Sequence, residues 1–415
     1  MVLLMKKQRI CRFCGEDLNK TFINLGAQPL SNSYVSDEKQ PENIYPLHVW
    51  VCGNCKLVQL EEYETPEEIF SEYSYFSSYS DSWLKHAKEY TDYMVERFGF
   101  NDKSHVVEIA SNDGYLLQYF IEKGIPVLGI EPAKNVAAVA EQKGVTTLSE
   151  FFGVALANKL AKKQKADLLL GNNVLAHVPD INDFVEGMHV LLADDGIITM
   201  EFPHLLQLIA NNEFDTIYHE HFSYLSFSVV NQIFAVHGLK IFDVEELETH
   251  GGSLRIFACH NNLNKYDISK SVAEMLRREE TACLLDMTAY THFEKRVQQT
   301  KRDLLSLLIQ LKNAGKNIVA YGAAAKGNTL LNYCGIGTDF INYVVDKNPN
   351  KQGVFLPGSR IPVLAPDIIK QTKPDYVLVL PWNLKSEITE QLSYIKDWQG
   401  KFIFAIPHVE VINAV

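Results

Sequence analysis

The fold is decided by the segment Val106-Val107-Glu108-Ile109-Ala110-Ser111-Asn112-Asp113-Gly114-Tyr115-Leu116-Leu117. Its apolar start predicts a strand, its polar centre predicts a tight loop, and its end predicts the first turn of a helix. A second apolar run, from Val127 to Ile130, ends in the carboxylate of Glu131. This order of strand, loop, helix and strand is typical of a Rossmann-type unit, in which an acid at the end of the second strand accepts the hydroxyls of a ribose.

Outward from this unit, short apolar runs alternate with amphipathic segments, which is typical of a doubly wound parallel sheet. Strands are predicted at 105–110, 126–130, 167–171 and 196–202 and, in a second block, at 317–321, 340–345, 376–380 and 401–405. Between the blocks, the apolar stripe over 267–316 predicts one long helix, or two helices broken near 282–288. The prediction is an α/β protein with two Rossmann-like domains, 71–265 and 266–415, the second of which includes the helical linker. A small N-terminal domain, 1–70, precedes them and contains four of the cysteines.

Length and composition exclude several classes of protein. The 415 residues are 47% hydrophobic and carry a formal net charge of −12, from 39 basic and 51 acidic side chains. Such values are typical of folded globular proteins and argue against a nucleic-acid-binding protein with a generally basic surface. The sequence shows neither an apolar run of membrane-spanning length nor the features of a signal peptide. We therefore expect a cytoplasmic protein that binds neither nucleic acid nor membrane, and leave its oligomeric state open.

Four of the seven cysteines form two Cys-x-x-Cys pairs, Cys11 with Cys14 and Cys52 with Cys55. Four thiolates complete the tetrahedral shell of a zinc ion and leave no position for a substrate, so we predict a structural zinc site. A redox pair and a coincidence of spacing are the alternatives. We expect the other three, Cys259, Cys283 and Cys334, to be small buried hydrophobic residues.

The loop after the first strand lacks the GxGxxG pattern and contains one glycine, Gly114. Three glycines bring the backbone close to a pyrophosphate, which S-adenosylmethionine (SAM) does not contain. The acids Glu108 and Asp113 suit the positive sulfonium and ammonium groups of SAM. We therefore predict a SAM site, with a nicotinamide cofactor or an ordinary α/β loop as alternatives; its residues are Glu108, Ala110, Asn112, Asp113, Gly114 and Glu131.

Two further segments extend the predicted SAM site. Phe151 and Phe152 follow a third short β segment and can enclose an adenine ring. Asn172 and Asn173 follow the fourth strand, at the carboxyl edge where ligands of such sheets bind.

A dense polar cluster is Asp215-Thr216-Ile217-Tyr218-His219-Glu220-His221-Phe222-Ser223-Tyr224. Tyrosine, histidine and glutamate crowded together are typical of general acid–base catalysis. Methylation of carbon requires a base that removes a proton beside a carbonyl group and a hydrogen-bond donor at the enolate oxygen, and a histidine with a tyrosine can supply both. A metal site through His219 and His221, and a structural hydrogen-bond network, are the alternatives.

Three other segments are candidates for the substrate pocket. The aromatic cluster from Tyr73 to Tyr79 is either a pocket wall or a packed seam between domains. The turn from His250 to Arg255 is either a pocket floor or a plain hairpin. In the last block a strand leads into a helix that carries Lys326, and Asp346 ends the next strand, which predicts contacts with nucleotide phosphate and ribose or, alternatively, a structural turn.

Together these motifs resemble the sugar C-methyltransferases of deoxysugar biosynthesis. The resemblance rests on the doubled Cys-x-x-Cys pattern and on the segments EIASNDGYLL, NNVLAHV, IYHEHFSYLS, HGGSLR and AYGAAAKGNTLLN, in this order over essentially the whole chain. It implies a zinc-binding N-terminal domain, a SAM-binding middle domain and a C-terminal Rossmann-like domain. The implied reaction is C-methylation, usually at C-3, of a dTDP- or GDP-linked 4-keto-deoxysugar through an enolate.

The resemblance also implies roles for single residues. His221 would be the general base, Tyr218 and Glu220 would orient the sugar and the base, and His177 and Tyr75 would line the sugar pocket. Further substrate-binding candidates are Tyr79, Tyr224, Arg255, Lys326 and Asp346. The rival functions are a sugar O-methyltransferase, a non-catalytic zinc-stabilised binding protein and a nicotinamide-dependent sugar enzyme.

Overall fold

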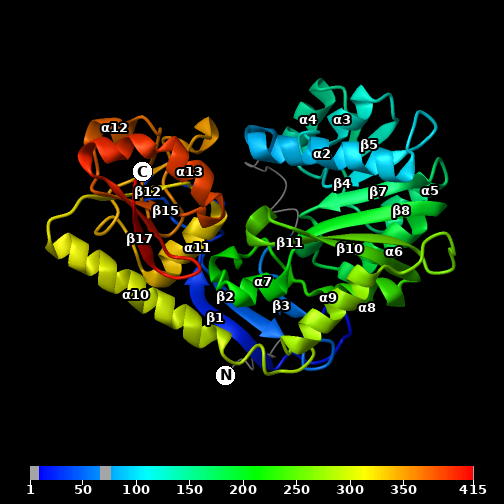
Figure 1. Ribbon diagram of the computed structural model, residues 1–415, viewed down its shortest axis with the longest axis horizontal. Helices are drawn as coiled ribbons and strands as arrows, with labels where there is room; N and C mark the ends of the chain where they lie inside the picture. Colours follow the sequence, from blue (N-terminus) through cyan, green and yellow to red (C-terminus); the bar gives the residue numbers. More distant parts are fainter. Residues whose placement is uncertain (1–8, 66–75, 415) are drawn as a thin grey trace.

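The computed structural model describes residues 9–65 and 76–414. Three β-sheets organise these residues, with four, seven and six strands. Figure 1 shows the seven-stranded and the six-stranded sheets on opposite sides of the molecule, with the N-terminal strands below and between them. Within the described residues, no helix combines the length and the apolar character that a membrane span requires.

The four-stranded sheet is antiparallel and joins distant parts of the chain. Its strands, in spatial order, are β1 (Lys20–Gln28), β2 (Tyr45–Val51), β3 (Val58–Leu60) and β9 (Ser223–Tyr224). Three of them precede the first Rossmann-type unit, whereas β9 belongs to the polar cluster. Val58 pairs with Tyr224 and Gln59 with Ser223, so the polar cluster completes the N-terminal sheet.

The seven-stranded sheet has the order β10-β11-β8-β7-β4-β5-β6. Its strands are β4 (Val106–Ile109), β5 (Val127–Ile130), β6 (Thr147–Leu148), β7 (Ala166–Asn172), β8 (Leu192–Pro203), β10 (Leu239–Leu247) and β11 (Ser253–His260). Strands β4 to β8 run parallel, and β11 runs antiparallel to both of its neighbours. The strands predicted at 105–110, 126–130, 167–171 and 196–202 are confirmed as β4, β5, β7 and β8.

Helices cover both faces of this sheet, which explains why its central strands are apolar on both sides. Helices α2 (Asp81–Phe98) and α3 (Leu117–Glu122) pack on one face around Tyr90 and Phe120. Helices α5 (Val154–Ala161), α6 (Ile181–Leu191) and α8 (Phe227–Val236) pack on the other face around Phe184 and Phe234. Two further helices are α4 (Lys134–Gln142) and α7 (Leu205–Ala210).

The linker forms two helices, α9 (Lys270–Thr281) and α10 (Phe293–Asn313), so the break predicted near 282–288 is confirmed. Cys283 has the left-handed backbone φ of 60°, and the Asp286 carboxylate accepts a hydrogen bond from the amide of Thr288. A left-handed residue cannot continue a right-handed helix, and an aspartate that bonds the amide two residues later forms a local turn. Both features therefore end the helical stretch between α9 and α10. Helix α9 packs against β10, whereas α10 packs against β1. The domain boundaries at residues 70 and 265 stay predictions.

The six-stranded sheet has the order β14-β13-β12-β15-β16-β17 and is parallel except for β17. Its strands are β12 (Ile318–Tyr321), β13 (Val344–Val345), β14 (Val363–Leu364), β15 (Tyr376–Val379), β16 (Lys401–Phe404) and β17 (Glu410–Asn413). Its helices are α11 (Ala325–Cys334), α12 (Ile368–Thr372) and α13 (Lys385–Gln391).

The strands predicted at 317–321, 376–380 and 401–405 are confirmed as β12, β15 and β16. The strand predicted at 340–345 is wrong over its first four residues. There the amides of Phe340 and Ile341 both bond to the carbonyl oxygen of Gly337 in a turn, and only Val344–Val345 pairs in the sheet. Both larger sheets are Rossmann-like.

Candidate active site

Two topological switch points share one cavity. The strand order reverses at β4 in the middle sheet and at β12 in the C-terminal sheet, and ligands of open α/β sheets bind at such points, beyond the carboxyl ends of the strands. The loops that follow β4, β7, β12 and β15 line the same cavity of about 770 Å³. The loop after β4 contributes Ala110 and Asn112, and the loop after β7 contributes Asn173 and His177. On the C-terminal side, Ala324 and Lys326 follow β12, and Pro381 and Asn383 follow β15.

The cofactor end of the cavity is built around Glu131, which follows β5 and is 5% exposed. Its two carboxylate oxygens accept hydrogen bonds from the backbone amides of Asn112, at 3.0 Å, and Ala133, at 2.9 Å. These bonds fix the carboxylate at the mouth of the loop that carries Ala110 and Asn112, both with positive φ. Each oxygen keeps a lone pair, which suits two ribose hydroxyls.

The left-handed conformation of Gly114 is required by packing. Its φ is +74°, and a Cβ atom there would lie 2.8 Å from Cγ2 of Val145. Gly114 therefore lets the loop turn back tightly onto the sheet without lining the cavity itself.

Acidic side chains dominate beneath this loop. Glu108 is fully buried, and its burial, together with the charges of Glu131 and Asp113, raises its pKa well above the usual value. Asp113 pairs with Lys143 at 3.0 Å. Neither Glu108 nor Asp113 is among the residues that line the cavity, so the two acids predicted for the sulfonium and ammonium of SAM lie beneath the loop. Ala110, Asn112 and Glu131 do line it.

The predicted adenine and carboxyl-edge residues line the same end of the cavity. They are Phe151, Phe152, Asn172 and Asn173. Phe151 is 42% exposed, and Phe152 packs edge-on against Phe184. Within the described residues, neither amide atom of the buried Asn172 side chain makes a hydrogen bond. An unbonded buried amide is costly, so Asn172 is suited to hold a polar ligand such as SAM.

The polar cluster is held in place by hydrogen bonds to the N-terminal, middle and C-terminal parts of the chain. Phe222 accepts a hydrogen bond from the amide of Leu60 in β3 (3.0 Å) and donates one to the carbonyl oxygen of Ala176, which follows β7 (2.8 Å). Two bonds come from the C-terminal part of the chain: Thr329 Oγ1 donates to Ile217 O (2.8 Å), and Trp382 Nε1 donates to Asp215 Oδ2 (2.8 Å). This bracing brings His221 and His177 together from separate segments, and their ring centroids lie 4.6 Å apart.

His221 has the geometry of a general base. Its Nδ1 lies 3.0 Å from the carbonyl oxygen of Thr216, which can only accept, so Nδ1 carries the proton and Nε2 carries a lone pair. Nε2 is buried and makes no hydrogen bond within the described residues. Burial, with the neighbouring His177, lowers the pKa of His221 well below its usual value, which keeps the imidazole neutral.

The neighbours of His221 divide between the cavity and the interior. Tyr218 and His177 line the cavity, and the Tyr218 ring lies 4.1 Å from the ring of His221. Burial lowers the pKa of His177 to about 4. Glu220 is buried behind the wall and accepts a 2.6 Å hydrogen bond from the cavity residue Asn32.

His219 points elsewhere. Its Nε2 lies 3.3 Å from the carbonyl oxygen of Pro46, and its ring contacts Tyr45 and Tyr63 of the N-terminal region. Among the described residues, the possible metal ligands that cluster in a group of three or more are the four cysteines, and neither His219 nor His221 belongs to such a group. A metal site through His219 and His221 therefore has no support in the geometry.

The C-terminal side of the cavity carries Lys326, in the first turn of α11. Its Nζ donates to Asn383 Oδ1 at 2.7 Å and lies 4.9 Å from the ring centroid of Trp382. Burial lowers its pKa, while the charges of Asp215 and Glu213 act in the opposite direction. A buried ammonium group at a helix N-terminus suits an anionic ligand.

Four of the substrate-binding candidates do not line the cavity. Asp346 accepts hydrogen bonds from the amides of Ala323 and Asn348, and so shapes the loop after β12. Arg255 bonds Glu201 through Nε (2.8 Å) and Nη2 (2.6 Å), which explains its burial away from ligands. The other two are Tyr79, which is 61% exposed, and Tyr224, which is buried in β9. Tyr75 lies outside the described residues.

The cavity also contains residues that were not among the predicted site residues. The most prominent are Asn32, Trp83, His86, His250 and Lys351. The glycine pair after His250 marked that turn as a possible pocket floor, but no spacing or residue type distinguished the other four. They reach the cavity only through the packing of separate elements.

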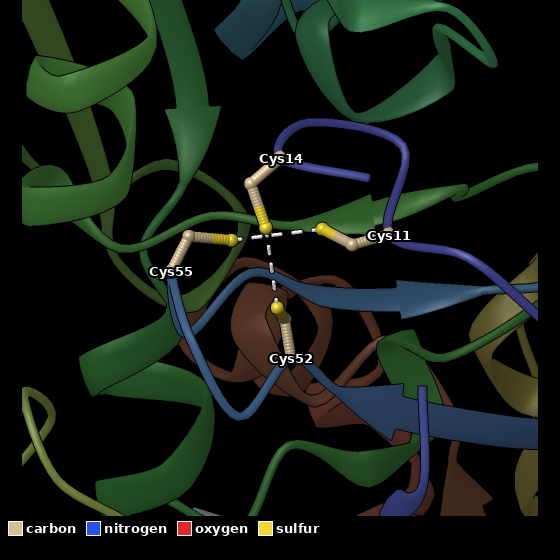
Figure 2. Close-up of side chains that lie close together, drawn as sticks. All are labelled: Cys11, Cys14, Cys52 and Cys55. Atoms are coloured by element: carbon tan, nitrogen blue, oxygen red, sulfur yellow. Dashed lines mark hydrogen bonds between the residues drawn. The ribbon is translucent and has the colours of Figure 1, made fainter. Parts of the chain in front are cut away.

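The metal centre lies away from the cavity. Figure 2 shows the four cysteine side chains converging from two loops, one before β1 and one between β2 and β3. All four sulfur atoms lie within 4.8 Å of one another, and Cys11–Cys55 and Cys14–Cys52 are 3.6 Å and 3.5 Å apart. Sulfur atoms around a tetrahedral zinc ion are about 3.8 Å apart, so the donor set fits zinc. Gln59 Nε2 donates to Cys11 Sγ at 3.1 Å and orients that ligand.

Comparison with known proteins agrees with this architecture. Residues 11–70 match the family model described as "Putative zinc binding domain", residues 83–244 match "Methyltransferase domain", and residues 248–407 match "C-methyltransferase C-terminal domain". Two solved structures are similar at low identity. Magnesium protoporphyrin IX methyltransferase from Synechocystis PCC 6803 with bound SAM is 14% identical, over 43% of this chain and 79% of that chain, with a TM-score of 0.33. The PH0226 protein from Pyrococcus horikoshii OT3 is 13% identical, over 48% and 99%, with a TM-score of 0.38.

One curated relative matches along nearly the whole length. The C-methyltransferase NovU from Streptomyces niveus is 37% identical over 407 residues, which are 97% of each chain. This match confirms the family to which the motifs pointed. The matched zinc-binding and methyltransferase models and the four grouped cysteines support zinc and SAM as the cofactors. The chain therefore belongs to the SAM-dependent C-methyltransferase family.

Proposed function

We propose that the protein methylates a nucleotide-linked 4-keto-deoxysugar at C-3 through an enolate, in deoxysugar biosynthesis in the cytoplasm. The observation that carries this proposal is the shared cavity, which is lined by Glu131 and Asn172, by His221 and Tyr218, and by Lys326. A methyl donor, a base and a group for an anionic nucleotide are the three parts that such a reaction requires. The C-4 ketone acidifies the proton on C-3, so a neutral imidazole with an open Nε2 is a suitable base.

In this proposal the chain's residues act in sequence on the sugar. Nε2 of His221 removes the C-3 proton, and the bond from Nδ1 to Thr216 holds the ring in place. Tyr218 and Glu220 orient the sugar and the base, and His177 and Tyr75 line the sugar pocket. Tyr75 lies outside the described residues. When bound, SAM supplies an electrophilic methyl group to the carbon nucleophile.

The nucleotide would lie against the C-terminal domain. Lys326 and the amides of the first turn of α11 face the cavity and suit a diphosphate. Asp346 would support this arrangement through the loop after β12, since both of its oxygens bond backbone amides. The nucleotide is dTDP or GDP, and the experiment below distinguishes the two.

The test is incubation of the protein with SAM and a panel of dTDP- and GDP-linked 4-keto-deoxysugars, followed by mass spectrometry and NMR. The expected product is heavier by one methyl group and carries it on carbon, with loss of the C-3 proton signal. The matched control is the same sugars with the ketone reduced to an alcohol. A methyl group on oxygen, or methylation of the reduced sugars, would show that the protein is an O-methyltransferase instead.

A further inference from the structure

The turn between β10 and β11 places His250 in the wall of the cavity. His250 has φ +57° and ψ 17°, and it is followed by Gly251 and Gly252, which also have positive φ. The left-handed conformation is sterically unfavourable for a residue with a Cβ atom. Strained backbone of this kind persists where the surrounding structure enforces it, and it occurs often at functional sites.

The surroundings of the turn enforce this conformation. A Cβ atom on Gly251 would lie 2.5 Å from Cη2 of Trp382, and one on Gly252 would lie 2.7 Å from Cγ of Gln207. The turn is also tied by hydrogen bonds from Gly252 N to Thr249 O, at 2.9 Å, and from His204 N to Gly252 O, at 3.0 Å. The backbone is therefore clamped between the middle and C-terminal domains, and the side chain of His250 is presented inward.

The imidazole of His250 has an open hydrogen-bonding position. Its Nε2 is buried and makes no hydrogen bond within the described part of the chain. The ring meets the ring of Trp83 edge to face, with centroids 5.3 Å apart, and this contact fixes its orientation. A buried polar atom without a partner destabilises the fold, and a hydrogen bond to a ligand oxygen would remove that penalty.

The electrostatic surroundings favour a developing negative charge. His250 interacts with Lys326, with the carboxylate of Glu201 and, more weakly, with two histidines, His86 and His177. Glu201 is held in an ion pair with Arg255 at 2.6 Å, whereas Lys326 lines the cavity. Burial, with a contribution from Lys326, lowers the pKa of His250 to about 4. A neutral imidazole that is protonated at Nε2 can donate a hydrogen bond from this atom to an oxyanion and needs no charge of its own.

We propose that His250 is a further catalytic residue, whose imidazole donates a hydrogen bond to the ketone oxygen of the substrate as enolate charge develops there. The inference rests on the proposed function and assigns the oxyanion donor to a turn outside the polar cluster. The C–H proton passes to His221 Nε2, and the C–H electron pair forms the C=C bond while the carbonyl π pair moves to oxygen. The π pair then returns, the C=C pair forms the new bond to the methyl carbon, and the sulfur of the donor keeps the pair of the broken S–C bond. His250 keeps its proton throughout.

Two substitutions separate the side chain from the backbone. His250→Gly removes the imidazole and adopts positive φ without strain, and His250→Asn tolerates the same conformation and restores an amide N–H. Lys373→Gly is the matched control, because Lys373 is an exposed residue with φ 45° at the end of α12.

The measurement is deuterium incorporation at the carbon beside the ketone, in D₂O and without SAM, with the dTDP- or GDP-linked keto sugar that the wild type exchanges fastest. Removal of an oxyanion donor is expected to slow exchange by about 10²-fold or more, with a similar loss in methyl transfer. His250→Asn should recover part of the rate, and Lys373→Gly should retain it. SAM affinity and the melting temperature of His250→Gly should stay within twofold and within about 3 °C of the wild type.

Exchange by His250→Gly at more than one third of the wild-type rate would overturn the proposal. Weakened SAM binding with unchanged exchange would also overturn it, because His250 would then serve the cofactor. A wild type that exchanges no proton in any sugar of the panel would overturn the proposed function and, with it, this role. Normal exchange in the wild type and in His250→Gly contradicts the role of His250 alone.

Discussion

His221 donates a hydrogen bond from Nδ1 to the backbone carbonyl oxygen of Thr216 at 3.0 Å. This bond settles which ring nitrogen is protonated and directs the lone pair of Nε2 to the cavity. The ring of His221 is therefore held by the main chain and not by a carboxylate, which suits the role of base proposed for it. A backbone carbonyl fixes the ring without adding negative charge, so burial can keep the imidazole neutral.

Replacement of His221 by Ala should abolish proton exchange at the carbon beside the ketone and leave SAM affinity nearly unchanged. The physical reason is that the substitution removes the imidazole nitrogen that would accept the proton and leaves Glu131 and Asn172 in place. Exchange is followed by NMR in D₂O, and SAM binding by calorimetry. Retained exchange would exclude His221 as the base, and His189→Ala, on α6 outside the cavity lining, is the control.

Replacement of Glu131 by Gln should weaken SAM binding about 10- to 100-fold, because hydrogen bonds to a charged acceptor are worth about 1.5–3 kcal/mol. The amide retains the size of the side chain but offers one acceptor where the carboxylate offers two. Calorimetric titration with SAM measures the effect. Glu122→Gln, at the exposed end of α3, controls for the change in net charge, and equal affinities for both variants would remove Glu131 from the site.

Replacement of Cys52 by Ser should reduce bound zinc and lower the melting temperature, since a structural metal contributes directly to folding. Metal analysis by mass spectrometry and thermal unfolding are the measurements. Cys283→Ser is the control, because Cys283 is half-buried and is not one of the four cysteines whose sulfur atoms lie together. Freshly purified protein without zinc would contradict the structural-zinc prediction.

Replacement of Lys326 by Gln should raise the KM for the sugar nucleotide about tenfold or more and change kcat little. Lys326 lines the side of the cavity where the nucleotide is proposed to bind, whereas the proposed base is His221. The effect should shrink at high salt, as expected for binding of an anion. Lys316→Gln, at an exposed surface pair with Asp375, is the control, and an unchanged KM would place the diphosphate elsewhere.

The stability effect of Glu213 should depend on pH. Burial raises the pKa of Glu213 to about 8, and Asp215 contributes in the same direction. Between the ordinary glutamate pKa, near 4.5, and 8, the folded state holds a proton that the unfolded state has lost. Glu213 therefore costs increasing stability as pH rises through this window. The melting temperature of Glu213→Gln, measured against wild type, should rise between pH 5 and pH 8; a difference independent of pH would contradict the assignment.

The sequence predicted those parts of the fold that depend on local patterns. Buried parallel strands are continuous apolar runs, so β4, β5, β7 and β8 were found to within a few residues, and the Cys-x-x-Cys spacing found the metal ligands. The strand over 340–345 was overpredicted because an apolar run has the same appearance in a strand and in the buried turn that contains Ile341.

The parts that the sequence did not predict depend on contacts between separate segments. Arg255 was expected in the pocket because it follows a flexible turn, but the partner that keeps it buried, Glu201, stands on another strand. Trp83 and His250 reach the cavity from α2 and from the β10–β11 turn, and nothing local to either residue indicates that they meet. Such long-range partners are settled by tertiary packing.

The pairing of β9 with β3 has a consequence for protein engineering. Because Ser223 and Tyr224 complete the sheet that begins beside the metal centre, the N-terminal residues are not an exchangeable module. A chimera that joins this N-terminal sheet to another methyltransferase core would need a matching edge strand in that core, at the position that Ser223 and Tyr224 occupy here. Recombination between relatives should therefore succeed where both halves of this strand pair come from the same parent.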